Sequence, residues 1–403
     1  MGARRVVVTG LGCISAQGHD VASCWAALAA GRSAIGPLTG MPGDLPLRLA
    51  VAAQVRDFDP AAYFNPQELG LLDRFSLFAL LAAREACGDA GLAAPLGQAA
   101  VVLGSGIGGI TTLDDGFRRL YVDRVHRVNP LSVPRVMQSA PVSAVSMALG
   151  ITGACFGVSS ACSSANHALI QALWLVRMGV APLALAGGAE ACLSPGVIKG
   201  WEALRVLAPD TCRPFSVDRK GLVLGEGAGV LVLEDLDHAR ARGARIYAEL
   251  AGGGMSADAG DIVQPASDGA ARAMAGALAE AGLAPEAVDY INAHGTGTQA
   301  NDVTETRAIR AVFGQHAGRL AVSSGKSMHG HALGAAGGLE AVATVKTLAE
   351  GLIPPTANFT RPDPACDLDY VPNEPRHQEA GAALSNAFAF GGLNAVLAFR
   401  RWP

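Results

Sequence analysis

The amino-acid sequence predicts an α/β fold in which helices pack against buried β-sheets. Short runs rich in β-branched residues alternate along the chain with Ala- and Leu-rich segments. Half of the 403 residues are hydrophobic and only 16% are charged, which is enough apolar material for a large core. The 50 glycines follow no fixed period, so they indicate tight turns and close backbone approaches rather than a fibrous repeat.

The individual elements follow from the same pattern. Runs of Val, Leu and Ala predict buried strands, and longer segments with apolar residues at helical spacing predict helices. The predicted strands cover residues 6–8, 100–103, 183–186 and 230–233, and the predicted helices cover residues 24–30 and 74–90. Because both kinds of element are apolar enough to be buried, stacked layers of helix and sheet are expected.

Two glycine-rich segments suggest an internal duplication. Residues 225–229 precede the strand at 230–233, and residues 391–394 precede a similar apolar run at 395–399. If each pair closes one half of the molecule, the boundary lies in the polar segment 240–245. The sequence therefore predicts an N-terminal half, residues 1–243, and a C-terminal half, residues 244–403.

The composition excludes several classes of function. The formal charge is −4 and no basic block is present, so nucleic-acid binding is not expected. The longest apolar stretches, such as residues 180–186, are too short to cross a bilayer. The apolar run at the start breaks at residues 9–10, which favours a buried strand over a signal peptide. The eight cysteines include no Cys-x-x-Cys pair, which predicts free thiols, a cytoplasmic location and no metal site.

One glycine-rich motif imitates a nucleotide-binding loop. Residues 104–109 match the G-x-G-x-x-G spelling after a predicted strand. A dinucleotide site also needs an acidic residue that ends the next strand, and Asp123 at about the right distance follows no strand. We therefore expect the glycines to let this loop pass close to a buried group.

Cys162 is placed where a reactive cysteine is expected. Small polar residues at 159–164 precede a good apolar helix at 165–174, and the serines there are N-cap candidates. A helix N-terminus favours the thiolate and lowers the pKa of a cysteine, and the thiolate is the nucleophile. A small buried cysteine that only packs is the alternative, and the helix start alone does not exclude it.

Two histidines and a lysine lie in glycine-rich loops. His294 follows a predicted strand at 289–293, and Lys326 and His331 precede a helix of small residues at 332–338. Burying such polar groups is unfavourable unless they are paired or functional, and Glu340 is a candidate partner for Lys326. Several polar groups that converge on a buried helix start indicate an active site.

Together these motifs resemble the elongating β-ketoacyl-acyl-carrier-protein synthases, a resemblance that covers essentially the whole chain. The residues in and around these motifs are most similar to those of nodulation-type and type II polyketide ketosynthases. The motifs occur in family order at residues 161–164, 213–215, 225–229, 292–298, 326–331 and 386–392. The resemblance implies the thiolase fold, with two similar halves in a five-layered αβαβα arrangement and a dimeric assembly.

The resemblance also implies a ping-pong decarboxylative Claisen condensation in fatty-acid or polyketide, possibly polyene, synthesis. Cys162 would carry the acyl group, and His294 and His331 would bind the malonyl thioester oxygen. Lys326 would orient these histidines with Glu340 as its partner. The N–H groups of Cys162 and Phe390 would form the oxyanion hole, with Phe390 also a gate, and no cofactor is implied beyond carrier phosphopantetheine. The residues implied to contact the phosphopantetheine arm are Thr296 and Thr298.

Several positions depart from the family pattern. Ala389 and Leu393 replace the usual Gly and Thr near the gate, and His329 stands where a small polar residue is commoner. Ile107 matches an acyl-pocket position. Ser132 replaces a bulky aromatic, which predicts a longer or differently shaped acyl tunnel, and Ser132→Phe is then expected to shorten the products. Basic residues that usually dock an acidic carrier appear as Gln67, Gly70 and Leu71, which leaves Arg124 and Arg127 as docking candidates.

The partners implied are an acyl carrier protein and a second subunit, either a copy of this chain or a chain-length-factor-like protein. Other readings remain open at this point. A degradative thiolase or a hydroxymethylglutaryl-type synthase shares the fold, but the motif of Lys326 and His331 argues against both. A non-catalytic partner subunit would lack the cysteine that this chain keeps at position 162.

Overall fold

The computed structural model describes residues 4–42 and 46–403, and within them a ten-stranded sheet forms the centre of the molecule. The strand order across this sheet is β10-β9-β13-β14-β8-β1-β7-β6-β4-β5. The strands are β1 (Val6–Ser15), β4 (Ala100–Gly104), β5 (Cys155–Val158), β6 (Leu183–Glu190), β7 (Gly227–Asp235), β8 (Ala248–Ala257), β9 (Tyr290–Asn292), β10 (Ala321–Ser323), β13 (Ala382–Ala389) and β14 (Leu393–Arg401). Two small hairpin-like pairs join β2 (Gly36–Pro37) to β3 (Val51–Ala52) and β11 (Leu352–Ile353) to β12 (Arg376–His377).

The helices fill the connections between these strands. The α-helices are α1 (Val21–Ala29), α2 (Pro66–Leu71), α3 (Arg74–Asp89), α4 (Ile110–Tyr121), α5 (Ser132–Val136), α6 (Ala140–Leu149), α7 (Ser164–Arg177), α8 (Pro195–Leu204), α9 (Leu236–Ala241), α10 (Ser267–Ala281), α11 (Gln299–Phe313), α12 (Lys326–His329) and α13 (Ala336–Glu350). Short 3₁₀ turns include η2 (Ala161–Ser163) before α7 and η5 (Leu333–Ala335) before α13.

The two halves of the sheet repeat the same topology. The order β5-β4-β6-β7-β1 on one side matches β10-β9-β13-β14-β8 on the other, strand for strand in the sequence. In each half three strands run parallel and the last two pairings are antiparallel. The halves meet through the short β1–β8 pairing. The predicted pair of similar α/β halves is therefore confirmed, and a boundary at residues 243/244, between α9 and β8, stays a prediction.

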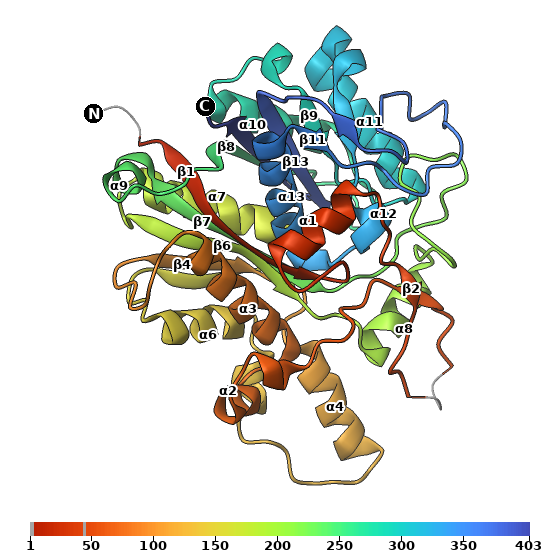
Figure 1. Ribbon diagram of the computed structural model, residues 1–403. Helices are drawn as coiled ribbons and strands as arrows, with labels where there is room; N and C mark the ends of the chain where they lie inside the picture. The colour runs from red at the N-terminus through yellow and green to blue at the C-terminus, as the bar shows by residue number, and fades with distance from the viewer. Residues whose placement is uncertain (1–3, 43–45) are drawn as a thin grey trace.

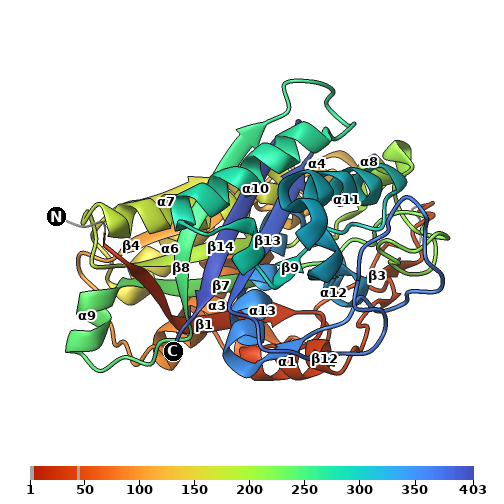
Figure 2. The ribbon, with the colours of Figure 1, turned by 90° about the horizontal axis from the view of Figure 1, so that it is seen from above.

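Helices and half-sheets alternate in layers (Figure 1). Helices α3 and α6 cover the outer face of the N-terminal half, and α10 and α11 cover the outer face of the C-terminal half. Figure 2 shows α10 and α11 lying across strands β8, β14, β13 and β9. Helices α7 and α13 lie between the two half-sheets, so the arrangement has the five layers αβαβα.

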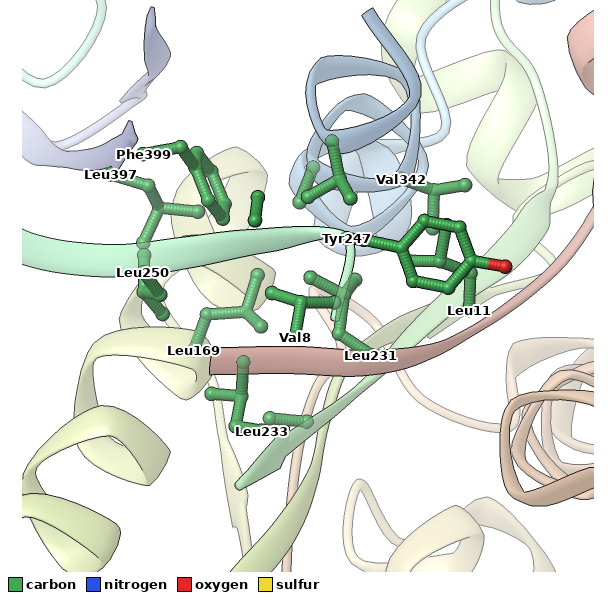
Figure 3. Packing of buried hydrophobic residues seen from close by; sticks show 14 of the residues in the cluster. Val8, Leu11, Leu169, Leu231, Leu233, Tyr247, Leu250, Val342, Leu397 and Phe399 are labelled. Carbon is green, nitrogen blue, oxygen red and sulfur yellow. The ribbon is translucent and has the colours of Figure 1, made fainter. Parts of the chain in front are cut away.

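A hydrophobic core fills the space around the central helices (Figure 3). Leu169 of α7, Val342 of α13, Leu231 of β7 and Leu397 of β14 meet there. Each fully buried Leu or Val contributes about 1.5–3 kcal/mol of transfer free energy. This shared core fixes the two half-sheets against the same pair of helices.

Close approach between backbones explains some of the glycines. A Cβ on Gly229 of β7 would lie 2.3 Å from the carbonyl carbon of Gly338 in α13, so neither position tolerates a side chain. Strand β1 continues to Ser15, beyond the predicted strand at 6–8. Gly10 and Gly12 sit within β1 because a Cβ there would meet backbone oxygens of α3 at 2.2 and 1.8 Å. They are contacts for a helix and not the end of the strand.

Candidate active site

Cys162 lies on a tight strand-to-helix turn. Strand β5 ends at Val158, the turn η2 contains Cys162, and α7 begins at Ser164. Ala161, which precedes the cysteine, has a φ of +51°, a conformation that a non-glycine residue adopts only under constraint. Gly104 of β4 permits this packing, because a Cβ there would lie 2.4 Å from the Ser164 carbonyl carbon. The turn therefore holds the cysteine at a defined point above the ends of β4 and β5.

The electrostatics of Cys162 differ from the prediction made from its helix start. Burial raises the pKa of the thiol to about 11, although Lys326 and the backbone N–H groups of Phe390 and Cys162 lower it. The prediction of a lowered pKa is therefore wrong, because desolvation of the thiolate outweighs the charge of Lys326 and the two backbone N–H groups. The predicted serine cap is also absent, since Ser163 makes no side-chain hydrogen bond to the first turn of α7. The resting thiol is neutral.

His294 and His331 face the same cavity as Cys162. His294 follows β9, and His331 follows α12; both are buried. Their ring centroids are 5.4 Å apart and the rings are nearly perpendicular, at 84°. Cys162, His294 and His331 line one cavity of about 300 Å³. The loops that sequence analysis identified separately thus converge on a single space.

Neighbouring donors set the tautomer of each histidine. The backbone N–H of Leu333 donates to Nδ1 of His331 over 3.2 Å, and the Nζ of Lys326 lies 3.5 Å from Nδ1 of His294. With a donor facing Nδ1, a neutral imidazole carries its proton on Nε2. Burial and the positive charge of Lys326 hold the pKa of both rings well below 6.5. Both histidines are therefore neutral N–H donors at physiological pH.

Lys326 and Glu340 form a buried ion pair beneath the histidines. The Nζ of Lys326 donates to Oε1 of Glu340 and, over 2.7 Å, to the backbone oxygen of His294. Both side chains are almost fully inaccessible. They come from different helices, α12 and α13. Burial raises the pKa of Glu340 to about 7 and Lys326 opposes this effect.

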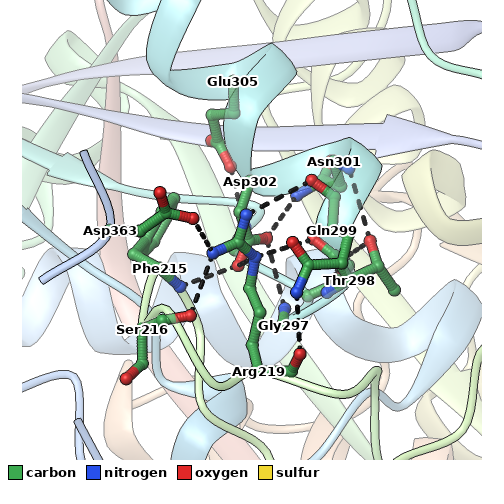
Figure 4. A network of polar contacts seen from close by, with 12 residues as sticks. Phe215, Ser216, Arg219, Gly297, Thr298, Gln299, Asn301, Asp302, Glu305 and Asp363 are labelled. Carbon is green, nitrogen blue, oxygen red and sulfur yellow. Dashed lines mark hydrogen bonds and ion pairs between the residues drawn. The ribbon is translucent and has the colours of Figure 1, made fainter. Parts of the chain in front are cut away.

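Two acidic residues that sequence analysis missed, Asp302 and Glu305, hold the loop that carries His294, and both belong to the polar network of Figure 4. Glu305 of α11 accepts the backbone N–H groups of His294 and Gly295, both over 2.8 Å. Asp302, one turn earlier, accepts the backbone N–H groups of Phe215 and Gly297. The three-residue spacing of these acids after the loop was the available signal.

Arg219 completes this network. Its guanidinium is inaccessible, lies 3.6 Å from Asp302, and pairs with Asp363. It also donates to the backbone oxygen of Ser216 over 2.9 Å and to that of Thr298 over 3.3 Å. The buried guanidinium of Arg219 thus links the segment after β9 to the residues that follow α8.

The predicted arm-binding and gate residues lie on the wall of the same cavity. Thr296 and Thr298 line it, and their hydroxyl oxygens are 2.9 Å apart. Thr298 is also the N-cap of α11, where its hydroxyl accepts the N–H of Asn301. Phe390 follows β13 and stacks on Trp201 of α8, with ring centroids 5.8 Å apart. The stacked pair covers one side of the cavity.

Three other predicted positions lie outside this cavity. Ile107 is half-buried and packs against the apolar cluster that contains Cys162. Ser132 begins α5 and lines a separate surface hollow of about 380 Å³. His329 is buried, and its Nδ1 lies 2.9 Å from the backbone oxygen of Gly330. It faces a small void beside Cys13 and Cys24.

All eight cysteines are free thiols. In the part of the chain that the structure describes, no group of three or more His, Cys, Asp or Glu is placed to hold a metal ion. Among the same residues, no helix is long and apolar enough to span a membrane.

Comparison with known proteins extends over both halves. The family described as "Beta-ketoacyl synthase, N-terminal domain" matches residues 3–239, and "Beta-ketoacyl synthase, C-terminal domain" matches residues 247–360. Nodulation protein E of a Rhizobium species is 50% identical over 406 residues, with 99% of each chain covered. The 3-oxoacyl-[acyl-carrier-protein] synthase 2 of a Synechocystis species is 43% identical, with 99% and 98% covered. The solved ishigamide ketosynthase/chain length factor superposes with a TM-score of 0.95 at 37% identity, with both chains fully covered.

Proposed function

The chain belongs to the β-ketoacyl synthase family and is an acyltransferase that performs decarboxylative Claisen condensation, and we propose that Cys162 is its acyl-carrying nucleophile. The observation that carries this proposal is the convergence of Cys162, His294 and His331 on one cavity. The family match leaves no support for a degradative thiolase. A non-catalytic subunit is disfavoured by the complete set of reactive side chains.

The first half-reaction transfers an acyl group to Cys162. The sulfur attacks the carbonyl carbon of an acyl thioester, and the displaced thiol leaves with the proton that the cysteine gives up. The negative oxygen of the tetrahedral intermediate accepts the backbone N–H groups of Cys162 and Phe390, both of which lie close enough to the sulfur to lower its pKa.

The second half-reaction makes the carbon–carbon bond. The thioester oxygen of a malonyl group accepts the Nε2–H groups of His294 and His331. Loss of CO2 leaves an enolate, whose negative oxygen these two donors stabilise. The enolate carbon attacks the acyl carbonyl on Cys162, the sulfur leaves as thiolate, and it takes a proton from water. Lys326 acts by holding His294, through the backbone oxygen and Nδ1 of that residue.

Replacement of the nucleophile tests the assignment. Cys162→Ala is expected to abolish condensation while decarboxylation of a malonyl carrier continues, because the histidine donors remain. Iodoacetamide should label Cys162 in the wild-type protein, as read by peptide mass spectrometry. Cys212→Ala, which removes a buried thiol hydrogen-bonded to a backbone oxygen, is the matched control and should keep both activities. Condensation by the Cys162→Ala variant would overturn the assignment.

We propose an acyl carrier protein as the partner that delivers both substrates on phosphopantetheine. The named relative from Synechocystis acts with such a carrier, and Thr296 and Thr298 line a cavity that suits the arm. Arg205 and Lys220 are exposed at the mouth of this cavity, where they can meet the phosphate. Arg124 and Arg127 stay predicted docking residues, and no further prosthetic group is proposed. A cytoplasmic location is proposed from the free thiols.

We also propose that the chain acts as a dimer through β5. This strand is at the edge of the sheet, so its outer backbone groups are open to pairing, and Phe156 on it is exposed. A second copy and a chain-length-factor-like subunit both fit, since the solved ishigamide complex pairs a ketosynthase with a chain length factor. A dimer also leaves room for Ser132 to meet an acyl chain from the neighbouring subunit.

The acyl chain needs apolar space beyond Cys162. Ile107 and Leu193 belong to the same apolar cluster as the cysteine. Leu193 also lines a second hollow of about 540 Å³, together with Phe117 and Tyr121 of α4. We propose that this hollow, with Ile107 at its entrance, houses the growing chain. Its size supports long products such as polyenes, and the pathway itself is a proposal.

A further inference from the structure

Glu190, the last residue of β6, is a buried carboxylate beside the catalytic cavity. Its Oε2 accepts the backbone N–H groups of Gly106, over 2.6 Å, and Gly334, over 3.0 Å. Its Oε1 accepts the N–H of Ile107 and the hydroxyl of Ser105, over 3.2 and 3.1 Å. Within residues 4–42 and 46–403 it forms no ion pair with a Lys, Arg or His. Four neutral donors thus surround one inaccessible carboxyl group, and burial raises its pKa from 4.5 to about 7, so it is ionised at the alkaline pH where the cysteine titrates.

This carboxylate joins the two halves of the molecule. Gly106 lies in the loop after β4 in the N-terminal half, and Gly334 lies in η5 of the C-terminal half. A Cβ on Gly334 would lie 2.7 Å from Oε2 of Glu190 and 2.2 Å from the backbone nitrogen of Gly106. A Cβ on Gly106 would lie 3.0 Å from the same oxygen. The glycines of the G-x-G-x-x-G match at 104–109 therefore allow the backbone of this loop to pack closely against a carboxylate.

One side of this clamp controls His331. Leu333 directly precedes Gly334, has a φ of +45°, and donates the N–H that fixes Nδ1 of His331. Such a backbone conformation persists only when neighbouring contacts enforce it. The bond from Gly334 to Glu190 is such a contact, one residue away.

The other side of the clamp reaches the nucleophile. The backbone oxygen of Ser105 accepts the Ser164 hydroxyl over 3.4 Å, and that hydroxyl also donates to the backbone oxygen of Ala161 over 2.6 Å. Ser105 is therefore connected to the residue that precedes Cys162. The same loop presents Ile107 to the apolar cluster around the cysteine.

We propose that Glu190 is a positioning residue that fixes Cys162 and His331 relative to each other by clamping the Ser105–Ile107 loop to Gly334. This inference rests on the proposed function, in which Cys162 is the nucleophile and His331 is a donor. Glu190 does not touch the reacting atoms. It holds the two loops that carry them, which come from different halves of the chain.

The charge of Glu190 also affects the titration of Cys162, which gives a measurable effect that a purely structural role would not produce. Its negative charge raises the pKa of the Cys162 thiol, against the lowering by Lys326. The other titratable groups around the cysteine are His294, His331 and the buried thiol of Cys192, and the same cavity is lined by the charged side chains of Arg205, Lys220 and Asp261. Because both histidines stay neutral well below pH 6.5, they leave the alkaline titration of the cysteine unchanged. Removal of the Glu190 charge must therefore move that titration to lower pH.

Two substitutions separate the effect of the Glu190 charge from the effect of its side-chain length. Glu190→Gln keeps the volume but removes the charge and points an NH2 group at backbone N–H donors, which leaves donors unsatisfied. Glu190→Asp keeps the charge but is shorter by one methylene, so it cannot reach both loops. Glu234→Gln is the matched control, because Glu234 is also buried and accepts three side chains, at the opposite end of the β6–β7 pairing.

The experiment measures condensation kinetics and the pH dependence of Cys162 alkylation by iodoacetamide in the full-length protein. For Glu190→Gln, kcat should fall about 10- to 100-fold while KM changes less than about twofold, since loop misplacement impairs the bound state. Its alkylation midpoint should move to lower pH, so alkylation at a fixed pH becomes faster as condensation becomes slower. For Glu190→Asp, kcat should fall while the midpoint stays near that of the wild type.

Opposite results overturn the proposal. A Glu190→Gln variant with an unchanged alkylation midpoint, or with a kcat loss no larger than that of Glu234→Gln, excludes the positioning role. If Glu190→Gln does not fold, Glu190→Asp decides, and wild-type kcat in that variant is the excluding result. Failure of the proposed function would give a different experimental result. The Cys162→Ala variant would still catalyse condensation, and Cys162 would not be the labelled residue in the wild-type protein.

Discussion

At the scale of single residues, one buried ion pair supports the catalytic histidines. Lys326 and Glu340 are almost inaccessible, and the second oxygen of Glu340 has no hydrogen-bond partner among the residues that the structure describes. A buried ion pair adds little net stability, but removal of one partner leaves an uncompensated charge. The pair therefore serves the orientation of His294 more than the stability of the fold.

Lys326→Met should lower the free energy of unfolding by about 3–5 kcal/mol, because Glu340 is left unpaired. The double variant with Glu340→Leu should recover most of that loss, since no charge is then buried. Decarboxylation of a malonyl carrier should stay low in both variants, because neither holds His294. Urea denaturation and a CO2-release assay measure the two quantities. Recovery of decarboxylation together with stability would show that Lys326 serves stability alone.

His329 gives a second prediction at this scale. Burial, with a smaller contribution from Lys326, lowers its pKa from 6.5 to about 4. Between these pH values His329 is protonated in the unfolded chain and neutral in the folded chain. The free energy of unfolding is therefore highest above pH 6.5 and falls as the pH decreases. Relative to His329→Gln, the wild-type protein should lose about 1.4 kcal/mol per pH unit across this window. Parallel pH profiles of the two proteins in chemical denaturation would contradict this.

At the scale of elements, loops held by buried polar networks position the catalytic groups. The loop between β9 and α11 carries His294, Thr296 and Thr298, and it is fixed by Glu305, Asp302 and Arg219 (Figure 4). Arg219 directs several donors of a planar group at separate backbone oxygens, which one ammonium group cannot reproduce.

Arg219→Lys should therefore loosen the threonine end of this loop. KM for a carrier-bound substrate should rise about tenfold, the equivalent of one lost charge-assisted hydrogen bond of about 1.5 kcal/mol. KM for a short thioester without the arm should change little. Arg177→Lys, which also breaks a carboxylate and carbonyl fork but at the far end of α7, is the control. Equal effects on both substrates would remove the link to the arm.

At the scale of the whole molecule, the proposed assembly uses an edge of the sheet. Strand β5 is paired on one side only, and the segment that follows it carries Cys162. A subunit that pairs with β5 would therefore also stabilise the nucleophile turn. Assembly and activity are expected to be lost together.

Phe156→Glu should convert the dimer to a monomer, because it places a charge at the centre of the proposed interface. Size-exclusion chromatography with light scattering measures the mass, and condensation should fall in parallel. Met178→Glu adds the same charge at a more exposed apolar site beyond the end of α7 and should leave the dimer intact. A dimeric Phe156→Glu variant would show that β5 is not the interface.

Much of this arrangement can be predicted from the sequence, because it depends on local patterns. The alternation of apolar runs indicated the layers, the two glycine-plus-strand segments indicated the repeat, and turn chemistry singled out Cys162, His294, Lys326 and His331. These features reside in consecutive residues. The motifs in family order then identified the reaction, since several separated motifs rarely coincide by chance.

What the tertiary structure decided depends on contacts between distant segments. Sequence alone predicted a lowered pKa for Cys162, whereas burial in the assembled cavity raises it. The roles of Glu190, Glu305 and Arg219 were invisible, because each acts by accepting or donating to backbone groups far along the chain. Desolvation and backbone hydrogen bonding are properties of the packed molecule. The sequence by itself therefore determined the family and pointed to the groups proposed to react, and the fold decided their protonation, orientation and distance.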